Sequence, residues 1–186
     1  MMIDVKPGDV LLVRPPDRSL LVRFANWAIA LGARLRHEPA EWTHVIIAHH
    51  TDAAGVFWGI QGQPGVVGWV DLTQFLADGT RTLTNVAQPK TDAARKVICD
   101  ALLPTVGVAE YDWAAIGVDA VIATGAIAWA DPLWKAVGRW GPTAPGHVVC
   151  SSVADWAYEQ AGLRAPGAGR FTTPGDWAQF IQRGAW

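Results

Sequence analysis

The chain has 186 residues, of which 51% are hydrophobic and 17% charged, so it can bury one sizeable core and is not a disordered tail. Its 15 basic and 17 acidic residues leave a formal charge of -2 without any Lys/Arg run, which excludes a surface that wraps nucleic acid. Two cysteines are too few for a disulfide scaffold or a tetrahedral zinc site, and they indicate a reduced compartment or one thiol with a chemical role.

Two stretches bear on targeting and membranes. The first residues lack the charged and apolar regions of a secretory signal, so we expect a cytoplasmic protein or one that another agent delivers. Residues 114–130 form an apolar run close to the length that a bilayer requires. Asp119 interrupts this run and would cost about 2.5–3.5 kcal/mol at mid-depth. We therefore expect a buried or partner-facing helix, with membrane contact through 114–130 as the alternative.

Apolar periodicity and turn residues predict five elements in the first third of the chain. They are a strand over 9–13, a helix from Ser19 to about Gly32, a strand over 43–50, a polar turn over 51–55 and a returning strand over 56–61. The helix is predicted to bury one stripe, which consists of Leu20, Phe24, Trp27, Ala28 and Leu31. The two strands joined by so short a turn must pair antiparallel.

The rest of the chain predicts five further elements. They are a strand over 66–70, a turn of helix over 72–76, a strand over 82–86, a helix over 91–103 and a helix over 150–161 that ends at Gly162. No internal repeat or linker divides the chain. The pattern indicates a single α+β domain over 1–186, with a small antiparallel sheet packed against helices.

The two cysteines occupy different positions in their predicted helices. Cys99 lies in mid-helix beside an apolar stripe, which is typical of a small residue at the edge of a core. Cys150 opens its helix, where unpaired N–H groups and the helix dipole stabilise a thiolate. The N–H groups of Cys150 and Ser151 are also placed to hold an oxyanion, and Ser152 to Asp155 resembles a capping box. The alternative is a buried structural role for Cys150.

A nucleophilic thiol needs an imidazole within hydrogen-bond reach, and five histidines are available. His44 enters an apolar strand without an obvious packing role, so it is the first candidate base; a hydrogen-bonded core histidine is the alternative. His147 precedes the thiol by three residues and is the reserve base. His49 and His50 border the turn and are predicted to be solvated, and His37 lies in a charged loop. The histidine and cysteine spacing matches no standard metal motif, so neither a metal nor another cofactor is expected.

Hairpin geometry nominates a third residue beside the imidazole. If His50 pairs with Gly55 across the turn, then Gln61 lies opposite His44. The Gln61 amide oxygen would accept a hydrogen bond from the ring N–H and orient the imidazole as a neutral partner. The alternative is an ordinary polar residue at the end of a strand.

Six stretches resemble, in order, the motifs of the permuted branch of the NlpC-type papain-like cysteine hydrolases, which includes YiiX-like and lecithin retinol acyltransferase-like enzymes. PGDVLL at 7–12 looks like the opening "pGDil" strand, WTHVI at 42–46 like the "sHvgi" histidine strand, and IQ at 60–61 with GV at 65–66 like "iEa…gV". EYDW at 110–113 is similar to "pYD", VCSSV at 149–153 to the "CSelv" helix, and TPGDW at 173–177 to the closing "tPgdl" turn. The order of histidine before cysteine is the mark of the permuted branch.

The resemblance implies one permuted NlpC-type papain-like hydrolase domain over 1–186, with Cys150 as the nucleophile, His44 as its base and Gln61 where many members carry an acid. It implies a thiol hydrolase without a cofactor that cleaves an amide bond, first of all in peptidoglycan stem peptide. One alternative is a lipid acyl hydrolase or acyltransferase, for which 114–130 would lie beside a membrane. Another is a phage tail or virion component that keeps the fold and binds tail proteins or its own copies. Phage delivery would also bring a cell-wall hydrolase to its substrate.

Overall fold

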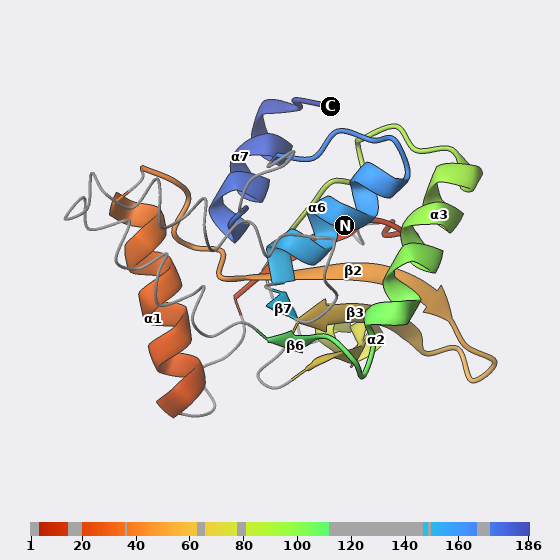
Figure 1. The fold of residues 1–186 in the computed structure, drawn as a ribbon, viewed down its shortest axis with the longest axis horizontal. Helices are drawn as coiled ribbons and strands as arrows, with labels where there is room; N and C mark the ends of the chain where they lie inside the picture. Colours follow the sequence, from red (N-terminus) through yellow and green to blue (C-terminus); the bar gives the residue numbers. More distant parts are fainter. Residues whose placement is uncertain are drawn as a thin grey trace.

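A computed structural model describes residues 4–14, 20–35, 37–62, 66–77, 81–111, 147–148, 150–166 and 172–186 (Figure 1). The helix expected over 114–130 lies outside these residues. Within the described part of the chain, no helix is both long enough and apolar enough to cross a membrane.

Five antiparallel strands form the main sheet, in the order β4-β3-β2-β1-β5. The strands are β1 (Val10–Val13), β2 (His44–Thr51), β3 (Phe57–Gly62), β4 (Val67–Asp71) and β5 (Thr82–Thr84). A separate parallel pair joins β6 (Glu110–Tyr111) to β7 (His147–Val148). The predicted α+β class, the antiparallel hairpin and the strands of the main sheet are confirmed, with ends that shift by one or two residues.

Helices lie on both sides of the main sheet. α3 (Asp92–Leu102), α6 (Cys150–Gln160) and α7 (Pro174–Arg183) lie on one side, and a short 3₁₀ helix (Leu103–Thr105) follows α3 (Figure 1). α2 (Leu72–Ala77) packs against the other face through Leu72. α1 (Leu20–Leu35) stands beside the sheet, at the left of Figure 1.

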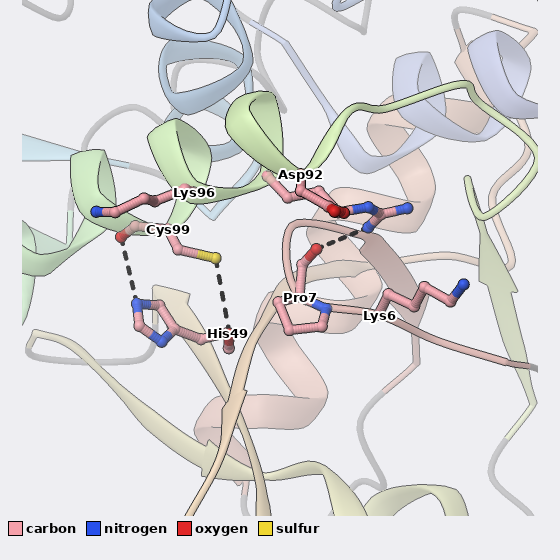
Figure 2. A pocket seen from close by; sticks show the side chains of 7 residues that line it. Lys6, Pro7, His49, Asp92, Lys96 and Cys99 are labelled. Atoms are coloured by element: carbon pink, nitrogen blue, oxygen red, sulfur yellow. Dashed lines mark hydrogen bonds between the residues drawn. The ribbon is translucent and has the colours of Figure 1, made fainter.

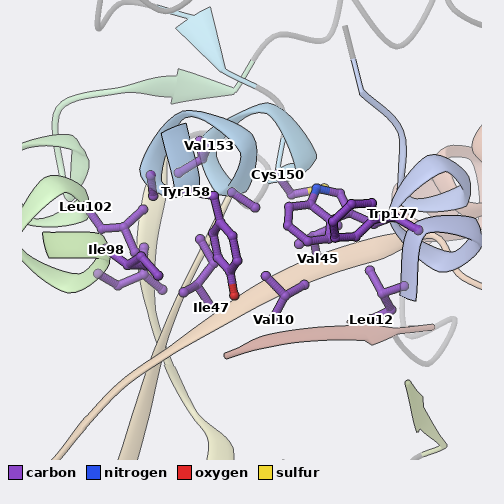
Figure 3. Close-up of a cluster of buried hydrophobic side chains, with 14 of the residues drawn as sticks. Val10, Leu12, Val45, Ile47, Ile98, Leu102, Cys150, Val153, Tyr158 and Trp177 are labelled. Carbon is purple, nitrogen blue, oxygen red and sulfur yellow. The ribbon is translucent and has the colours of Figure 1, made fainter. Parts of the chain in front are cut away.

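Alternating side chains of the central strands divide the core between the two faces. Val10 and Leu12 of β1 join the cluster beneath α6, which Figure 3 shows, whereas Leu11 and Val13 join the cluster with α2. All four are fully buried, and each such side chain contributes about 1.5–3 kcal/mol. A one-residue slip would exchange the two faces, so this packing fixes the register of the strands and with it the position of His44 on β2.

A buried ion pair joins the start of β1 to α3. The Asp9 carboxylate accepts hydrogen bonds from Lys90 Nζ at 2.8 Å and from an Arg95 guanidinium nitrogen at 2.9 Å, and the Asp9 and Lys90 side chains are fully buried. Gly8 has φ of 82°, and a Cβ there would lie 3.3 Å from Arg95 Cα. The Tyr158 hydroxyl of α6 donates to the Gly8 carbonyl at 2.7 Å. The PGD stretch therefore connects the sheet to two helices.

The helix near the N-terminus differs from the prediction. α1 continues past Gly32 to Leu35, because one glycine costs a helix only about 1 kcal/mol. Trp27, which was expected in the buried stripe, is 58% exposed, and the buried residues among the α1 side chains that the structure describes are Asn26, Ala30 and Ala33. Asn26 is buried because its Oδ1 accepts a hydrogen bond from Thr43 Oγ1 at 2.7 Å, immediately before His44.

The C-terminal stretch that was expected as a turn begins a helix. Thr173 is the N-cap of α7 and forms a capping box with Asp176, and Pro174 occupies the first turn. Gly184, with φ of 58°, ends the helix. The Thr-x-x-Asp spacing and the proline were visible in the sequence and would have predicted this start.

Candidate active site

The first residue of β2 and the first residue of α6 bring the predicted base and the predicted thiol together. His44 and Cys150 are hydrogen-bonded to each other through their side chains. Cys150 is only 4% exposed, whereas His44 is half-buried. Figure 3 shows Cys150 at the end of α6 nearest Trp177, above Val45 of the adjacent strand. The pair thus lies where a helix N-terminus meets the start of a strand.

Gln61 of β3 contacts the other side of the imidazole. Its Oε1 atom lies 2.7 Å from His44 Nε2. An amide oxygen only accepts hydrogen bonds, so Nε2 carries the proton and Nδ1 is the ring nitrogen left for the thiol. Cys150, His44 and Gln61 therefore form one connected set, as predicted.

The hairpin register that led to Gln61 was nevertheless wrong. Gln61 pairs with Ile46 rather than with His44, and His50 pairs with Trp58 rather than with Gly55. The turn lies over 52–56 rather than over 51–55, and Asp52 Oδ1 closes it by accepting hydrogen bonds from the N–H groups of Ala54 and Val56. The error is three residues at His50, and the irregularity between Ala48 and His50 reduces it to two residues at Ile46. An even error preserves the face of the strand, so Gln61 still reaches His44 diagonally.

Opposing effects act on the Cys150 thiol. Burial raises its pKa, while the charge of His44, the hydrogen bond to His44 and backbone hydrogen bonds from Val45 and Ser151 lower it. The lowering effects are larger, and the pKa lies below that of an ordinary thiol. The thiolate is therefore favoured at a pH at which an ordinary cysteine stays protonated.

The imidazole responds in the opposite sense. Burial lowers the pKa of His44, but the charge of Cys150 and the hydrogen bonds to Cys150 and Gln61 raise it above its ordinary value. A lowered thiol pKa next to a raised imidazole pKa favours a thiolate–imidazolium pair. Such a pair supplies a nucleophile and a proton donor at adjacent atoms.

The start of α6 is held by the segment before α7. Ser151 Oγ donates to the Thr172 carbonyl, and Thr172 Oγ1 donates to Asp155 Oδ2. Trp177 Nε1 donates to the Ser151 carbonyl at 3.4 Å. The predicted capping box was wrong, because Ser152 lies inside the helix and the Asp155 carboxylate binds Thr172 instead. Ser151 is thus fixed both by its side chain and by its carbonyl.

Cys99 has the environment expected of a structural cysteine. It is buried in α3, and its sulfur approaches the His49 carbonyl at 3.7 Å (Figure 2). Burial, together with the nearby Asp100 charge, raises its pKa to about 11. At neutral pH this thiol is protonated and unreactive, in contrast to Cys150.

Of the remaining histidines, His37, His49 and His50 have described side chains, whereas the side chain of His147, the reserve base, lies outside the described part of the chain. His37 is exposed, and His147 belongs to β7, where it pairs with Glu110. His50 is exposed as expected, but His49 was predicted to be solvated and is half-buried, with its Nε2 atom 3.3 Å from the Cys99 carbonyl. No group of three or more His, Cys, Asp or Glu residues among the described ones is arranged to hold a metal ion.

Val45 is the site residue that the sequence did not reveal. Its backbone N–H donates to the Cys150 sulfur, and its side chain packs in the core beneath α6. A backbone contact leaves no mark in the type of side chain, so the role of Val45 becomes visible only when β2 and α6 are seen packed together.

Comparisons with protein-family models, with curated proteins and with solved structures found no match for this chain. The assignment of a function therefore depends on the geometry of the site and on the motif resemblance.

Proposed function

We propose that the protein is a cysteine hydrolase of the permuted NlpC-type papain-like kind that cleaves an amide bond. The observation that carries the proposal is the side-chain set in which His44 contacts both the Cys150 thiol and Gln61 Oε1. The opposite shifts of the two pKa values support a charged nucleophile–base pair rather than a core cysteine beside a core histidine.

In the proposed reaction, the Cys150 thiolate attacks the carbonyl carbon of the substrate, and the carbonyl electrons move to the oxygen. N–H groups at the start of α6, from Cys150 and Ser151, hold this oxyanion. The C–N bond then breaks, the leaving amine takes a proton from the His44 imidazolium, and an acyl-thioester remains on Cys150. His44 next removes a proton from water, the hydroxide attacks the thioester, and the free acid leaves as the thiol is regenerated.

The proposed substrate is peptidoglycan stem peptide, which is the substrate class that the motif resemblance implies. Gln61 in this scheme keeps the His44 ring oriented through the Nε2–H bond, so that Nδ1 faces the sulfur. A neutral amide suffices for orientation, although it adds no charge to stabilise the imidazolium.

The test is incubation of the purified protein with cell-wall sacculi and, separately, with phospholipid vesicles, followed by mass spectrometry of the products. We expect new amine and carboxyl ends in muropeptides, and no such products from Cys150→Ala or His44→Ala. The two losses should be about equal, because residues that act as one unit are not additive. Products from the lipid vesicles instead would favour an acyl hydrolase or acyltransferase over an amide hydrolase. If neither substrate gave a product, the proposal of a catalytic site would be contradicted.

A further inference from the structure

A β-bulge turns two consecutive histidines of β2 toward each other. The pairing with β3 runs from Ala48 and Gly59 directly to His50 and Trp58, so His49 is the additional residue. Successive side chains of a strand normally point to opposite faces. Here the Nδ1 atoms of His49 and His50 lie only 3.0 Å apart. Bulges re-aim side chains in this way, and they are over-represented beside functional sites.

The orientation of the His49 ring is fixed by α3. Its Nε2 atom contacts the Cys99 carbonyl at 3.3 Å, as Figure 2 shows. A carbonyl only accepts, so Nε2 carries the proton and Nδ1 presents a lone pair toward His50. Histidines that bind metals commonly donate their second ring N–H to a carbonyl in this manner.

We propose that His49 and His50 chelate one divalent copper ion through their two Nδ1 atoms. With metal–nitrogen bonds of about 2.0–2.1 Å, two nitrogens 3.0 Å apart subtend an angle of about 91–97° at the metal. That angle fits neighbouring positions of a square-planar site, which copper(II) prefers, better than the wider angle of tetrahedral zinc. Water completes the coordination, and the proton on His50 Nδ1 moves through solvent to His50 Nε2, so that each neutral imidazole offers an Nδ1 lone pair to the copper ion.

The two ring nitrogens of His49 face different surroundings. His49 also lines a cavity of about 360 Å³ whose basic residues Lys6, Arg95 and Lys96 lie toward α3 and the N-terminal segment. The Nδ1 side faces His50 instead, and His50 interacts electrostatically with Asp52. Trp69 stacks edge-on against both imidazoles, at centroid distances of 5.0 and 5.3 Å, and thus reports on the site.

The test is titration of the full-length Cys150→Ser protein with Cu²⁺ alone, since this substitution removes the one low-pKa thiol. We expect one copper per chain, two nitrogen ligands by electron paramagnetic resonance and quenching of tryptophan fluorescence. His49→Gln and His50→Ala should each weaken copper binding at least about tenfold. Substituting a group that only hydrogen-bonds to a metal ligand already lowers metal affinity about 10- to 100-fold, and these two residues are the proposed ligands themselves. Trp69→Phe should remove most of the quenching and keep the resonance spectrum.

His37→Asn is the matched control, because His37 is exposed and its φ of 58° suits asparagine. This variant should bind copper like its parent. His50 is also exposed, so His50→Ala keeps the test decisive if His49→Gln fails to fold. An affinity unchanged by His50→Ala, or lowered equally by His37→Asn, would overturn the proposal.

Discussion

His44 is bound on both sides of its ring, and each contact sets a different property. Cys150 supplies the charge that raises the pKa of the imidazole, and Gln61 fixes which nitrogen carries the proton. A carboxylate in place of Gln61 would do both. The neutral amide therefore leaves the charge balance of the site to the thiolate and to the N–H groups of Val45 and Ser151.

Substitutions of Gln61 separate orientation from charge. Gln61→Glu should retain or raise turnover, because a carboxylate next to Nε2–H stabilises the imidazolium. Gln61→Ala should lower turnover yet leave Cys150 open to alkylation, since the helix start still stabilises the thiolate. The measurement is the rate of amide cleavage together with the rate of alkylation, and Gln74→Ala on the exposed side of α2 is the control. Equal turnover of Gln61→Ala and the parent protein would show that the amide does not orient the ring.

At the scale of elements, the site depends on how β2 and α6 are held. β2 lies between β1 and β3, and the segment that opens β1 is attached to α3 through the Asp9–Arg95 contact and to α6 through Tyr158. Asn85, directly after β5, joins the same group, because it accepts from the Val10 N–H and donates to the Tyr158 hydroxyl. These hydrogen bonds give the polar groups that meet between the sheet and the helices the partners that burial requires.

The buried pair of Asp9 and Lys90 gives the element-scale prediction. Asp9→Asn keeps the shape of the side chain but leaves the fully buried Lys90 ammonium without its counter-charge. We expect the free energy of unfolding in urea to fall by about 3–5 kcal/mol, as is typical when one partner of a buried pair is removed.

Asp100→Asn is the control for this change. Asp100 pairs with Lys96 on the exposed side of α3, where a salt bridge contributes at most about 1 kcal/mol. If the two substitutions destabilised the protein equally, the buried pair of Asp9 and Lys90 would not make the contribution to stability that its burial predicts.

For the whole molecule, the sequence predicted the elements that have strong local periodicity. The apolar strands, the antiparallel hairpin and the helix that starts at Cys150 are confirmed, since burial on a pleated or helical face leaves a clear pattern. The prediction failed where tertiary contacts outweigh local pattern. Trp27 is exposed, whereas Asn26, Ala30 and Ala33 of the same helix are buried.

The candidate site shows the same division. His44 and Cys150 were identified by their places in a strand and at a helix start, and the structure brings them together. The bulge at His49 and the backbone contact of Val45 leave no mark in a sequence, because both arise from the pairing of strands and the packing of α6. Gln61 was reached through a register that was wrong by an even number of residues, which kept it on the correct face.

The most direct test of the account is the pH profile of Cys150 alkylation, read by peptide mapping in the parent protein and in His44→Ala. The lowered pKa of Cys150 means that its thiolate persists as the pH falls below the ordinary thiol value of about 8.5 and disappears only below the lowered pKa. The parent protein should therefore react at neutral pH, and His44→Ala should shift the curve to higher pH because the positive partner is lost. Cys99, with its pKa of about 11, is the internal reference and should be labelled only in alkali. Identical curves for the two proteins, or labelling of Cys99 before Cys150, would contradict a thiolate–imidazolium site.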